Sequence, residues 1–352
     1  MSYEDGWAAV NLEMPPRIPR TEFDAQCHWP LVKAVTGIAV SFDSPGELKQ
    51  TAMRAFVRAW NYDIQLSCLI GHGELDALRT NMGHAVYADG GSDYDPNIRC
   101  PFKTPEEVLA FDPWEVYGPR DKRELTRRFN EHYRATCEAY PDLVNMTGVY
   151  VSCVSGLIAI FGWEMLLLAA GLDPEGFGEV TNRYASWVRQ HYEALAEADV
   201  PVIYSHDDIV WTAGAIFRPD WYRRYVFPNL KKHYEPLVET GKKVIFVSDG
   251  DYTEFADDIA ACGVAGFFFE PLTDLRYLAE RYGGTHILIG NADTRVLLGG
   301  TKAQIRAEVE RCIAIGRRCP GYFMGVTNMI PPNTPVENAL YYNQVYEHLS
   351  RR

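Results

Sequence analysis

Between Pro201 and Asp293 the sequence repeats one pattern four times: a short apolar run that ends in polar residues. The four are Val202-Ile203-Tyr204-Ser205 before His206-Asp207-Asp208, Val244-Ile245-Phe246-Val247 before Ser248-Asp249-Gly250-Asp251, Gly266-Phe267-Phe268-Phe269 before Glu270, and His286-Ile287-Leu288-Ile289 before Gly290-Asn291-Ala292-Asp293. Segments with helical periodicity separate the runs, so the repeating unit is strand, polar end, helix. A parallel sheet of such units brings every polar end to one edge, which is where α/β folds carry out chemistry.

Outside this stretch, further strand-like runs bring the count to eight. They lie at Tyr62 to Ile70, Val144 to Cys153 and Gly321 to Val326, with an eighth expected at Gly37 to Ser41 or nearby. In a chain of 352 residues this number predicts a closed (β/α)8 TIM barrel rather than an open sheet. We expect one domain over residues 1–352, with an N-terminal arm at residues 1–45 and a small antiparallel excursion at residues 85–100.

Several helix boundaries carry capping signals. Thr104 before Pro105, and Thr334 before Pro335, predict an N-cap followed by proline at the first helical position. The prolines of the first 45 residues favour an extended arm there. The apolar stretch from Val154 to Gly171 is too interrupted by glycine, serine and glutamate for a membrane span, so it predicts a buried barrel helix.

Composition limits the classes of function. The formal charge of -13 disfavours nucleic-acid binding, which requires clustered Lys and Arg. The acidic N-terminus lacks the basic and apolar pattern of a secretory signal. Eight scattered cysteines without a C-x-x-C pair indicate free thiols in a reducing compartment. We therefore expect a cytoplasmic protein without a membrane or nucleic-acid partner.

Common catalytic motifs are missing from the sequence. Neither G-x-G-x-x-G after a strand nor G-x-x-x-x-G-K-[ST] occurs, so nucleotide cofactors lack support. The hydrolase signatures G-x-S-x-G and H-E-x-x-H do not occur either.

The candidate chemistry therefore lies in the polar strand ends. These residues are His72, Glu74, Cys153, His206, Asp207, Asp208, Asp249, Asp251, Glu270, Asn291, Asp293 and Asn328. Imidazole and carboxylate groups that converge in one mouth are ordinary ligands of zinc. They also form acid and base pairs whose pKa values burial drives apart.

Each candidate also has a structural explanation. Asp249 and Asp293 precede expected helices, where aspartate is a common N-cap. A histidine such as His206 at a strand end is often only hydrogen-bonded. Glu270 follows a Gly-Phe-Phe-Phe run close to the core, so it must be paired or functional. Aromatic residues near the mouth, among them Trp211 and Tyr252, belong to the core or line a pocket for a flat substrate.

The second half of the sequence resembles a known family, the uroporphyrinogen decarboxylase superfamily. The residues that carry the resemblance are Lys243 to Asp251, Gly263 to Phe267 with Glu270-Pro271, Gly290 to Asp293, and Ile330-Pro331-Pro332-Asn333-Thr334-Pro335-Val336-Glu337-Asn338. They cover the half of the chain from about Pro201 onward. The resemblance implies a single (β/α)8 barrel whose site lies at the C-terminal mouth.

The superfamily has two main branches, and two departures from its patterns decide between them. The sequence has Arg17 and Arg20 but not the R-Q-A-G-R-Y signature with which true decarboxylases grip propionates. Cobamide-dependent methyltransferases often hold zinc through H-x-C and a later Cys; here those positions read Val247-Ser248-Asp249 and Asn328. The chain looks most like the O-demethylases of this second branch, whose metal sites are richer in carboxylate and His.

The resemblance implies a methyltransferase that passes a methyl group from a small substrate, either a methoxylated (aromatic) or a methylated compound, to the corrinoid of a partner protein. Zinc or another metal held by His206, Asp249 and Glu270, or a carboxyl acid among Asp208, Asp249 and Glu270, would stabilise the departing oxygen. Substrate contacts are expected from Trp211, Tyr252, Asn291 and Asn328.

The alternative is a decarboxylase or lyase that acts on a smaller carboxylate bound by Arg17 or Arg20. A third option is a barrel that only binds a corrinoid or tetrapyrrole. Since the chain has no D-x-H-x-x-G segment of its own, a separate corrinoid protein is implied by the resemblance. The oligomeric state stays open, with a homodimer as one option.

Overall fold

The computed structural model describes residues 3–76, 78–81, 98–327 and 329–352. Its strands are β1 (Ile64–Gln65), β2 (Val144–Asn145), β3 (Thr147–Val149), β4 (Val202–His206), β5 (Val210–Trp211), β6 (Gly214–Ala215), β7 (Lys243–Ser248), β8 (Gly266–Phe269), β9 (Ile287–Ile289) and β10 (Tyr322–Phe323). Six of them form a parallel sheet in the order β10-β9-β8-β7-β4-β3, and β1 pairs in parallel with β2. β5 and β6 form a separate antiparallel hairpin.

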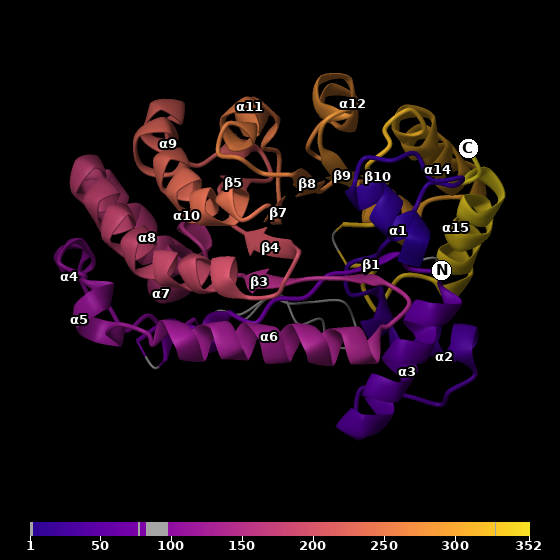
Figure 1. The fold of residues 1–352 in the computed structure, drawn as a ribbon, viewed down its shortest axis with the longest axis horizontal. Coiled ribbons are helices and arrows are strands. Elements are labelled where there is room, and N and C mark those ends of the chain that lie inside the picture. The colour runs from indigo at the N-terminus through magenta and orange to yellow at the C-terminus, as the bar shows by residue number, and fades with distance from the viewer. Residues whose placement is uncertain (1–2, 77, 82–97, 328) are drawn as a thin grey trace.

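Most of the helices surround the strands (Figure 1). They are α1 (Tyr3–Val10), α2 (Trp29–Thr36), α3 (Gly46–Ala59), α4 (Pro105–Leu109), α5 (Pro113–Tyr117), α6 (Lys122–Ala139), α7 (Val154–Leu172), α8 (Pro174–Glu197), α9 (Pro219–Tyr225), α10 (Phe227–Glu239), α11 (Ala256–Ala260), α12 (Leu275–Tyr282), α13 (Thr294–Gly299), α14 (Lys302–Gly316) and α15 (Val336–Leu349). Short 3-10 turns are η1 (Ala25–Cys27), η2 (His72–Leu75) and η3 (Thr253–Phe255).

The N-terminal segment Pro19 to Phe23 closes the barrel. On one side it runs parallel to the end of β10, through bridges of Arg20 to Met324 and of Phe23 to Met329. On its other side the Arg20 carbonyl accepts a hydrogen bond from the Asp63 amide, directly before β1. Counting β2 and β3 as one interrupted strand, eight parallel positions surround the axis, so the predicted (β/α)8 TIM barrel is confirmed.

Two predictions about the N-terminal region were wrong. The eighth strand is not at Gly37 to Ser41, because Gly37 ends α2 in a left-handed conformation with φ 73°. Residues 1–45 are not an extended arm throughout, since they contain α1, η1 and α2. The prolines do not prevent this: Pro30 lies in the first turn of α2, where its missing N–H is not needed.

Other local expectations had mixed outcomes. Thr104 caps α4 by accepting from the Glu107 amide, as predicted. Thr334 does not cap the last helix: Pro335 occupies the N-cap position and the buried Thr334 hydroxyl has no hydrogen-bond partner among the described residues. Most of the predicted excursion at residues 85–100 falls outside the described residues. All eight cysteines are free thiols.

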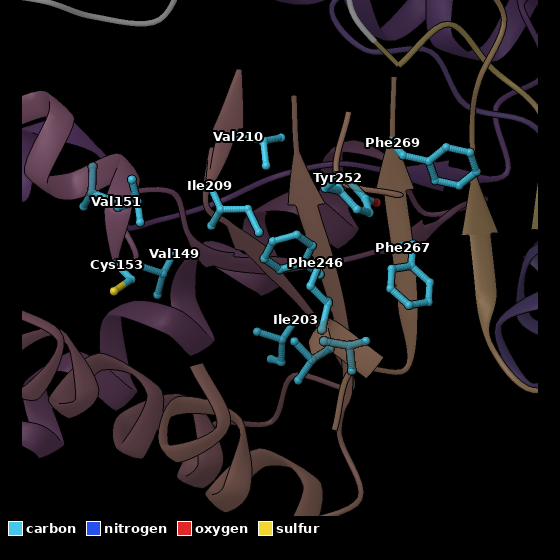
Figure 2. Packing of buried hydrophobic residues seen from close by; sticks show 14 of the residues in the cluster. Val149, Val151, Cys153, Ile203, Ile209, Val210, Phe246, Tyr252, Phe267 and Phe269 are labelled. Carbon is cyan, nitrogen blue, oxygen red and sulfur yellow. The ribbon is translucent and has the colours of Figure 1, made fainter. Parts of the chain in front are cut away.

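The core has two layers. Inside the barrel, side chains such as Val202, Ile245 and Ile289 pack together, and Ala9 and Val10 of α1 close the end where the strands begin. Between the strands and the helices, Phe246, Tyr252 and Phe267 belong to the larger outer cluster (Figure 2). Within the described residues α7 alone has the length and apolarity of a membrane span, and more than half of it is buried inside the fold, as predicted for a core helix.

Candidate active site

His206 and Asp208 form a charged pair at the end of β4. Alternation along the strand sends His206 toward the barrel axis together with Tyr204, and its Nε2 lies 3.1 Å from Oδ1 of Asp208. Nδ1 of His206 lies 3.0 Å from the Tyr150 carbonyl oxygen. Burial lowers the pKa of His206, but Asp208 and Asp249 outweigh burial and raise it to about 9. The imidazole is therefore a cation at neutral pH, with both nitrogens donating.

Asp207 points the other way and joins the end of β4 to α7. Its Oδ1 accepts from the Ser155 amide at 2.7 Å, while the Ser155 hydroxyl accepts from the Asp208 amide at 2.6 Å. Asp207 is fully buried, and this burial raises its pKa to about 7. The two reciprocal bonds hold the polar end of β4 against the first turn of α7.

Asp249 lies between two other carboxylates at the end of β7. Its own amide donates to Oδ1 of Asp208 at 3.0 Å, and the next amide, of Gly250, donates to Oε2 of Glu270 at 2.6 Å. Burial, followed by the like charges of Asp208 and Glu270, raises the pKa of Asp249 well above its usual range. Asp249 is therefore the carboxyl group of this set that is suited to carry a proton.

Two adjoining cavities lie near the His206–Asp208 pair. The larger, of about 260 Å³, is mainly apolar and is lined by Phe23, Leu66, Ser67, Cys68, Gly71, His72, Tyr150 and Tyr204. The smaller, of about 140 Å³, is lined by His72, Tyr150, Ser155, Ile158, Ala159, Trp163, His206 and Asp208. Both share His72 and Tyr150, and the Tyr150 ring stacks on His206 with 3.9 Å between centroids.

The other predicted substrate residues take different places. Trp211 is 56% exposed and stacks on Trp163, which lines the smaller cavity. Tyr252 is fully buried between the strands and helices, where its hydroxyl donates to the Phe268 carbonyl (Figure 2). Tyr252 therefore packs in the outer core and lines neither cavity. Asn328 lies outside the described residues.

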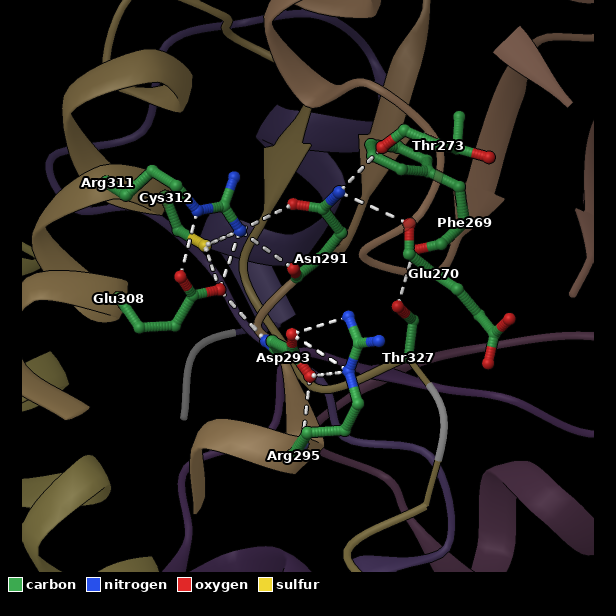
Figure 3. Close-up of polar contacts among 10 residues, drawn as sticks. All are labelled: Phe269, Glu270, Thr273, Asn291, Asp293, Arg295, Glu308, Arg311, Cys312 and Thr327. Carbon is green, nitrogen blue, oxygen red and sulfur yellow. Dashed lines mark hydrogen bonds and ion pairs between the residues drawn. The ribbon is translucent and has the colours of Figure 1, made fainter. Parts of the chain in front are cut away.

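Asn291 supports the loop that carries Glu270. Its side-chain amide donates to the carbonyl oxygens of Glu270 and Thr273, and Arg311 donates to its side-chain oxygen (Figure 3). Asp293 caps α13 by accepting from the Arg295 amide, which confirms its structural explanation. These bonds engage both the nitrogen and the oxygen of the Asn291 side chain. Asn291 therefore contributes by holding the main chain of the loop that carries Glu270.

The predicted metal set is not assembled. Across residues 3–76, 78–81, 98–327 and 329–352, no three His, Cys, Asp or Glu side chains meet in a group that could hold a metal ion. Nε2 of His206 faces Asp208, and Oε2 of Glu270 accepts from the Gly250 amide. The groups of His206, Asp249 and Glu270 therefore fit proton transfer and charge pairing better than metal ligation.

Arg17 and Arg20 are both engaged away from the two cavities. Arg17 pairs with Asp63 and Asp5. Arg20 is fully buried, pairs with Glu22 and lies 4.2 Å from the ring centroid of Tyr346. The described residues that line the two cavities include no Lys or Arg. The cations that the decarboxylase hypothesis assigned to a substrate acid are thus part of the barrel closure.

Sequence reasoning missed Tyr150 and Trp163. Tyr150 had a signal: Met146, Gly148 and Tyr150 alternate on one face of the predicted strand, and Met146 lies inside the barrel. No sequence signal marked Trp163 as a site residue, because it follows Gly162, whose φ of 69° breaks the helical backbone of α7. That break turns the continuation of the helix in a direction which periodicity does not reveal.

Comparisons with known proteins agree with this fold. The family described as "Uroporphyrinogen decarboxylase (URO-D)" matches residues 78–347. A uroporphyrinogen decarboxylase of Carboxydothermus hydrogenoformans is 29% identical over 181 residues, which are 50% of this chain and 49% of that protein. One of Thermus thermophilus is 29% identical over 161 residues, which are 46% and 45% of the two chains. The chain thus spans about half the length of the curated relatives it matches.

A solved structure covers the chain more fully. A methyltransferase from Methanosarcina mazei superposes with a TM-score of 0.66 at 17% identity and covers 99% of both chains. At this identity the likeness shows a shared fold.

Proposed function

The chain belongs to the uroporphyrinogen decarboxylase family, and from this premise we propose that it transfers a methyl group from a small methoxylated aromatic, or another small methylated donor, to the corrinoid of a partner protein. The observation that carries the proposal is the Asp249 carboxyl, which lies between Asp208 and Glu270. Of these carboxylates, Asp208 lines the smaller cavity together with His206. A fold shared over its full length with a methyltransferase supports this class of reaction.

The cavities suit a neutral aromatic donor. Phe23, Tyr150 and Tyr204 line the larger one, and aromatic walls bind flat rings through apolar burial and edge contacts. The smaller cavity brings His206 and Asp208 to the same wall. A ring in the larger cavity can therefore direct a methoxy oxygen toward His206 and Asp208, which line the adjoining smaller cavity at the end of β4.

The reduced corrinoid of the partner would supply the electron pair that takes the methyl carbon. As the carbon–oxygen bond breaks, its electrons stay on the oxygen, and Asp249 donates a proton to that atom. The product is a phenol, and Asp249 is left as a carboxylate between Asp208 and Glu270. That repulsion returns a proton from solvent to Asp249, so the acid is restored for the next turnover. His206, held as a cation by Asp208, stabilises the negative charge that develops at the oxygen.

The test is a methyl-transfer assay with Co(I) cobalamin as acceptor and a panel of methoxyarenes and methylamines as donors. We expect a methoxyarene to yield its phenol, and Asp249→Asn to lower kcat by about 10²–10⁴ because it removes a general acid. Glu254→Gln, which changes an exposed carboxylate in η3 directly after this loop, is the matched control and keeps the wild-type rate. An unchanged rate in Asp249→Asn would contradict the assigned acid.

The same assay separates an acid from a metal. Because the acid mechanism needs no metal, dialysis against a chelator leaves the rate unchanged. A rate that falls on dialysis and returns with zinc would instead support the metal-based alternative, with ligands among His206, Asp249 and Glu270.

A second candidate is decarboxylation of a small carboxylate, which the names of the curated relatives favour. Against it, Arg17 and Arg20 are committed to Asp63 and Glu22. Release of CO2 from a carboxylated aromatic, without methyl transfer from any donor, would favour this candidate over the first.

A further inference from the structure

His72 belongs to the site although it comes from a different part of the barrel than His206. It lines both cavities, and its ring meets Tyr150 edge-on with 5.3 Å between centroids. Because Tyr150 in turn stacks on His206, two imidazoles flank one phenol ring. A substrate that occupies either cavity is therefore adjacent to His72.

The turn that carries His72 is too short to hold its own position. η2 has four residues, follows Gly71 and ends at Asp76, whose φ of 45° stops further helix. A single 3-10 turn has poor hydrogen-bond geometry, so its place depends on side-chain anchors. Leu75 supplies an apolar anchor, since it is fully buried in the core.

Glu74 supplies the polar anchor. Its Oε1 accepts from Nε of Arg120 at 2.6 Å and lies 3.4 Å from Nε2 of His191, and its Oε2 lies 3.5 Å from Arg128. Arg120 also donates to the Glu74 carbonyl oxygen at 3.2 Å, so it holds the main chain of the turn as well as the side chain.

These partners are rigidly placed. Arg128 lies in α6 and His191 in α8, and these two helices pack against each other. Arg120 is fixed in turn by the Trp187 ring, 5.2 Å away, and by its own amide, which donates to the Gln190 side chain at 2.6 Å. The Glu74 side chain is only 8% exposed. Exposed ion pairs contribute little, whereas this one is shielded and forms several bonds.

We infer that His72 is a substrate-contacting residue of the site and that Glu74 is the positioning residue that holds it there through α6 and α8. The functional part of this inference rests on the proposed methyl transfer. Arg120 and His191 converge on Glu74 strongly enough that the pKa of Glu74 falls to about 2 although burial acts to raise it. The anchor therefore stays charged over the whole working range of pH.

The experiment is a double-mutant cycle with His72→Ala and Glu74→Gln. Because a displacement of about 1 Å in a positioned group can cost about 10²-fold, we expect Glu74→Gln to lower kcat/KM by about 10- to 100-fold. In the His72→Ala background the same change has almost no further effect, and Glu74→Asp recovers part of the activity. Glu193→Gln, which removes an exposed pair with Arg189 on α8, is the matched control without effect.

An NMR measurement separates this inference from the proposed function. The ring signals of His72, assigned through His72→Gln, shift in Glu74→Gln and not in Glu193→Gln. If they shift while no donor is demethylated, the positioning stands and the proposed function fails. If they do not move, or if Glu74→Gln costs the same factor with and without His72, the inference is overturned. Should Glu74→Gln fail to fold, Arg120→Lys weakens the same anchor. Its effects on the His72 ring signals and on kcat/KM are then compared in the same way, with and without His72→Ala.

Discussion

Asp207 is a fully buried carboxyl group whose position joins a strand to a helix. It accepts from the Ser155 amide, and its second oxygen has no hydrogen-bond partner among the described residues. Burial is the main reason that its pKa rises to about 7 from an ordinary value of 3.8. The folded protein thus binds this proton more tightly than the unfolded chain does.

The consequence is a pH-dependent stability with a defined sign. Asp207 contributes most to the free energy of unfolding below about pH 4. As the pH rises from there toward 7, this contribution is lost, and the free energy of unfolding falls by at most about 4 kcal/mol. Asp207→Asn, which still accepts from Ser155, is expected to lose this part of the pH dependence. Urea unfolding between pH 5 and 7.5 measures it, with Asp121→Asn, an exposed N-cap of α6, as control. Equal pH slopes in wild type and Asp207→Asn would contradict the assignment.

Among elements, the β5–β6 hairpin and the loop after β7 depend on each other. Gly250 has φ 80°, and a Cβ there would lie 2.6 Å from the Trp211 carbonyl oxygen. The loop therefore passes directly against the hairpin, and this contact sets the direction of Asp249 and of the Gly250 amide that binds Glu270. Only glycine satisfies both the backbone angle and the close approach.

Gly250→Ala is expected to destabilise the fold by about 1–3 kcal/mol and to reduce methyl transfer, because strain and a clash displace the loop of Asp249. Gly214→Ala provides the control: Gly214 has φ 104° in the same hairpin, but nothing lies within 4 Å of an added Cβ. The Gly214→Ala variant should therefore strain the hairpin backbone without moving Asp249. Thermal unfolding and the methyl-transfer rate of both variants check this, and equal rates would argue against the contact.

At the scale of the molecule, the barrel is closed by the segment Pro19 to Phe23, which forms isolated bridges and no regular strand. Arg20 and Glu22 form a buried pair in it, and Glu22 also accepts from the Val326 amide at 2.5 Å. The N-terminal segment is thereby bonded to the chain just after β10 through a charge that is out of contact with water.

Removal of one member of a buried pair leaves the other charge without compensation. Glu22→Gln is expected to cost about 3–5 kcal/mol of folding free energy. Asp142→Asn, which removes an exposed pair with Arg58 at 3.8 Å, should cost no more than about 1 kcal/mol. Chemical denaturation compares the two. Similar losses would mean that the pair does not stabilise the barrel closure.

The sequence by itself determined the parallel strands with polar ends, the helices between them and the location of the mouth. These features are encoded by neighbours along the chain: short continuous apolar runs in β4 and β7, and helical periodicity in α8 and α14. The same local information placed His206, Asp208, Asp249 and Glu270 at strand ends.

Only the tertiary structure decided how these groups act on one another. The closing segment Pro19 to Phe23 has no strand pattern, because its partners at β1 and β10 are far away in sequence. Tyr252 and Arg20, both candidates by sequence, became core and closure residues. The pKa of Asp249 is raised by burial and by the charges of Asp208 and Glu270, which meet it through space. Burial and repulsion between distant residues set a pKa, and neither can be read from a run of neighbouring letters.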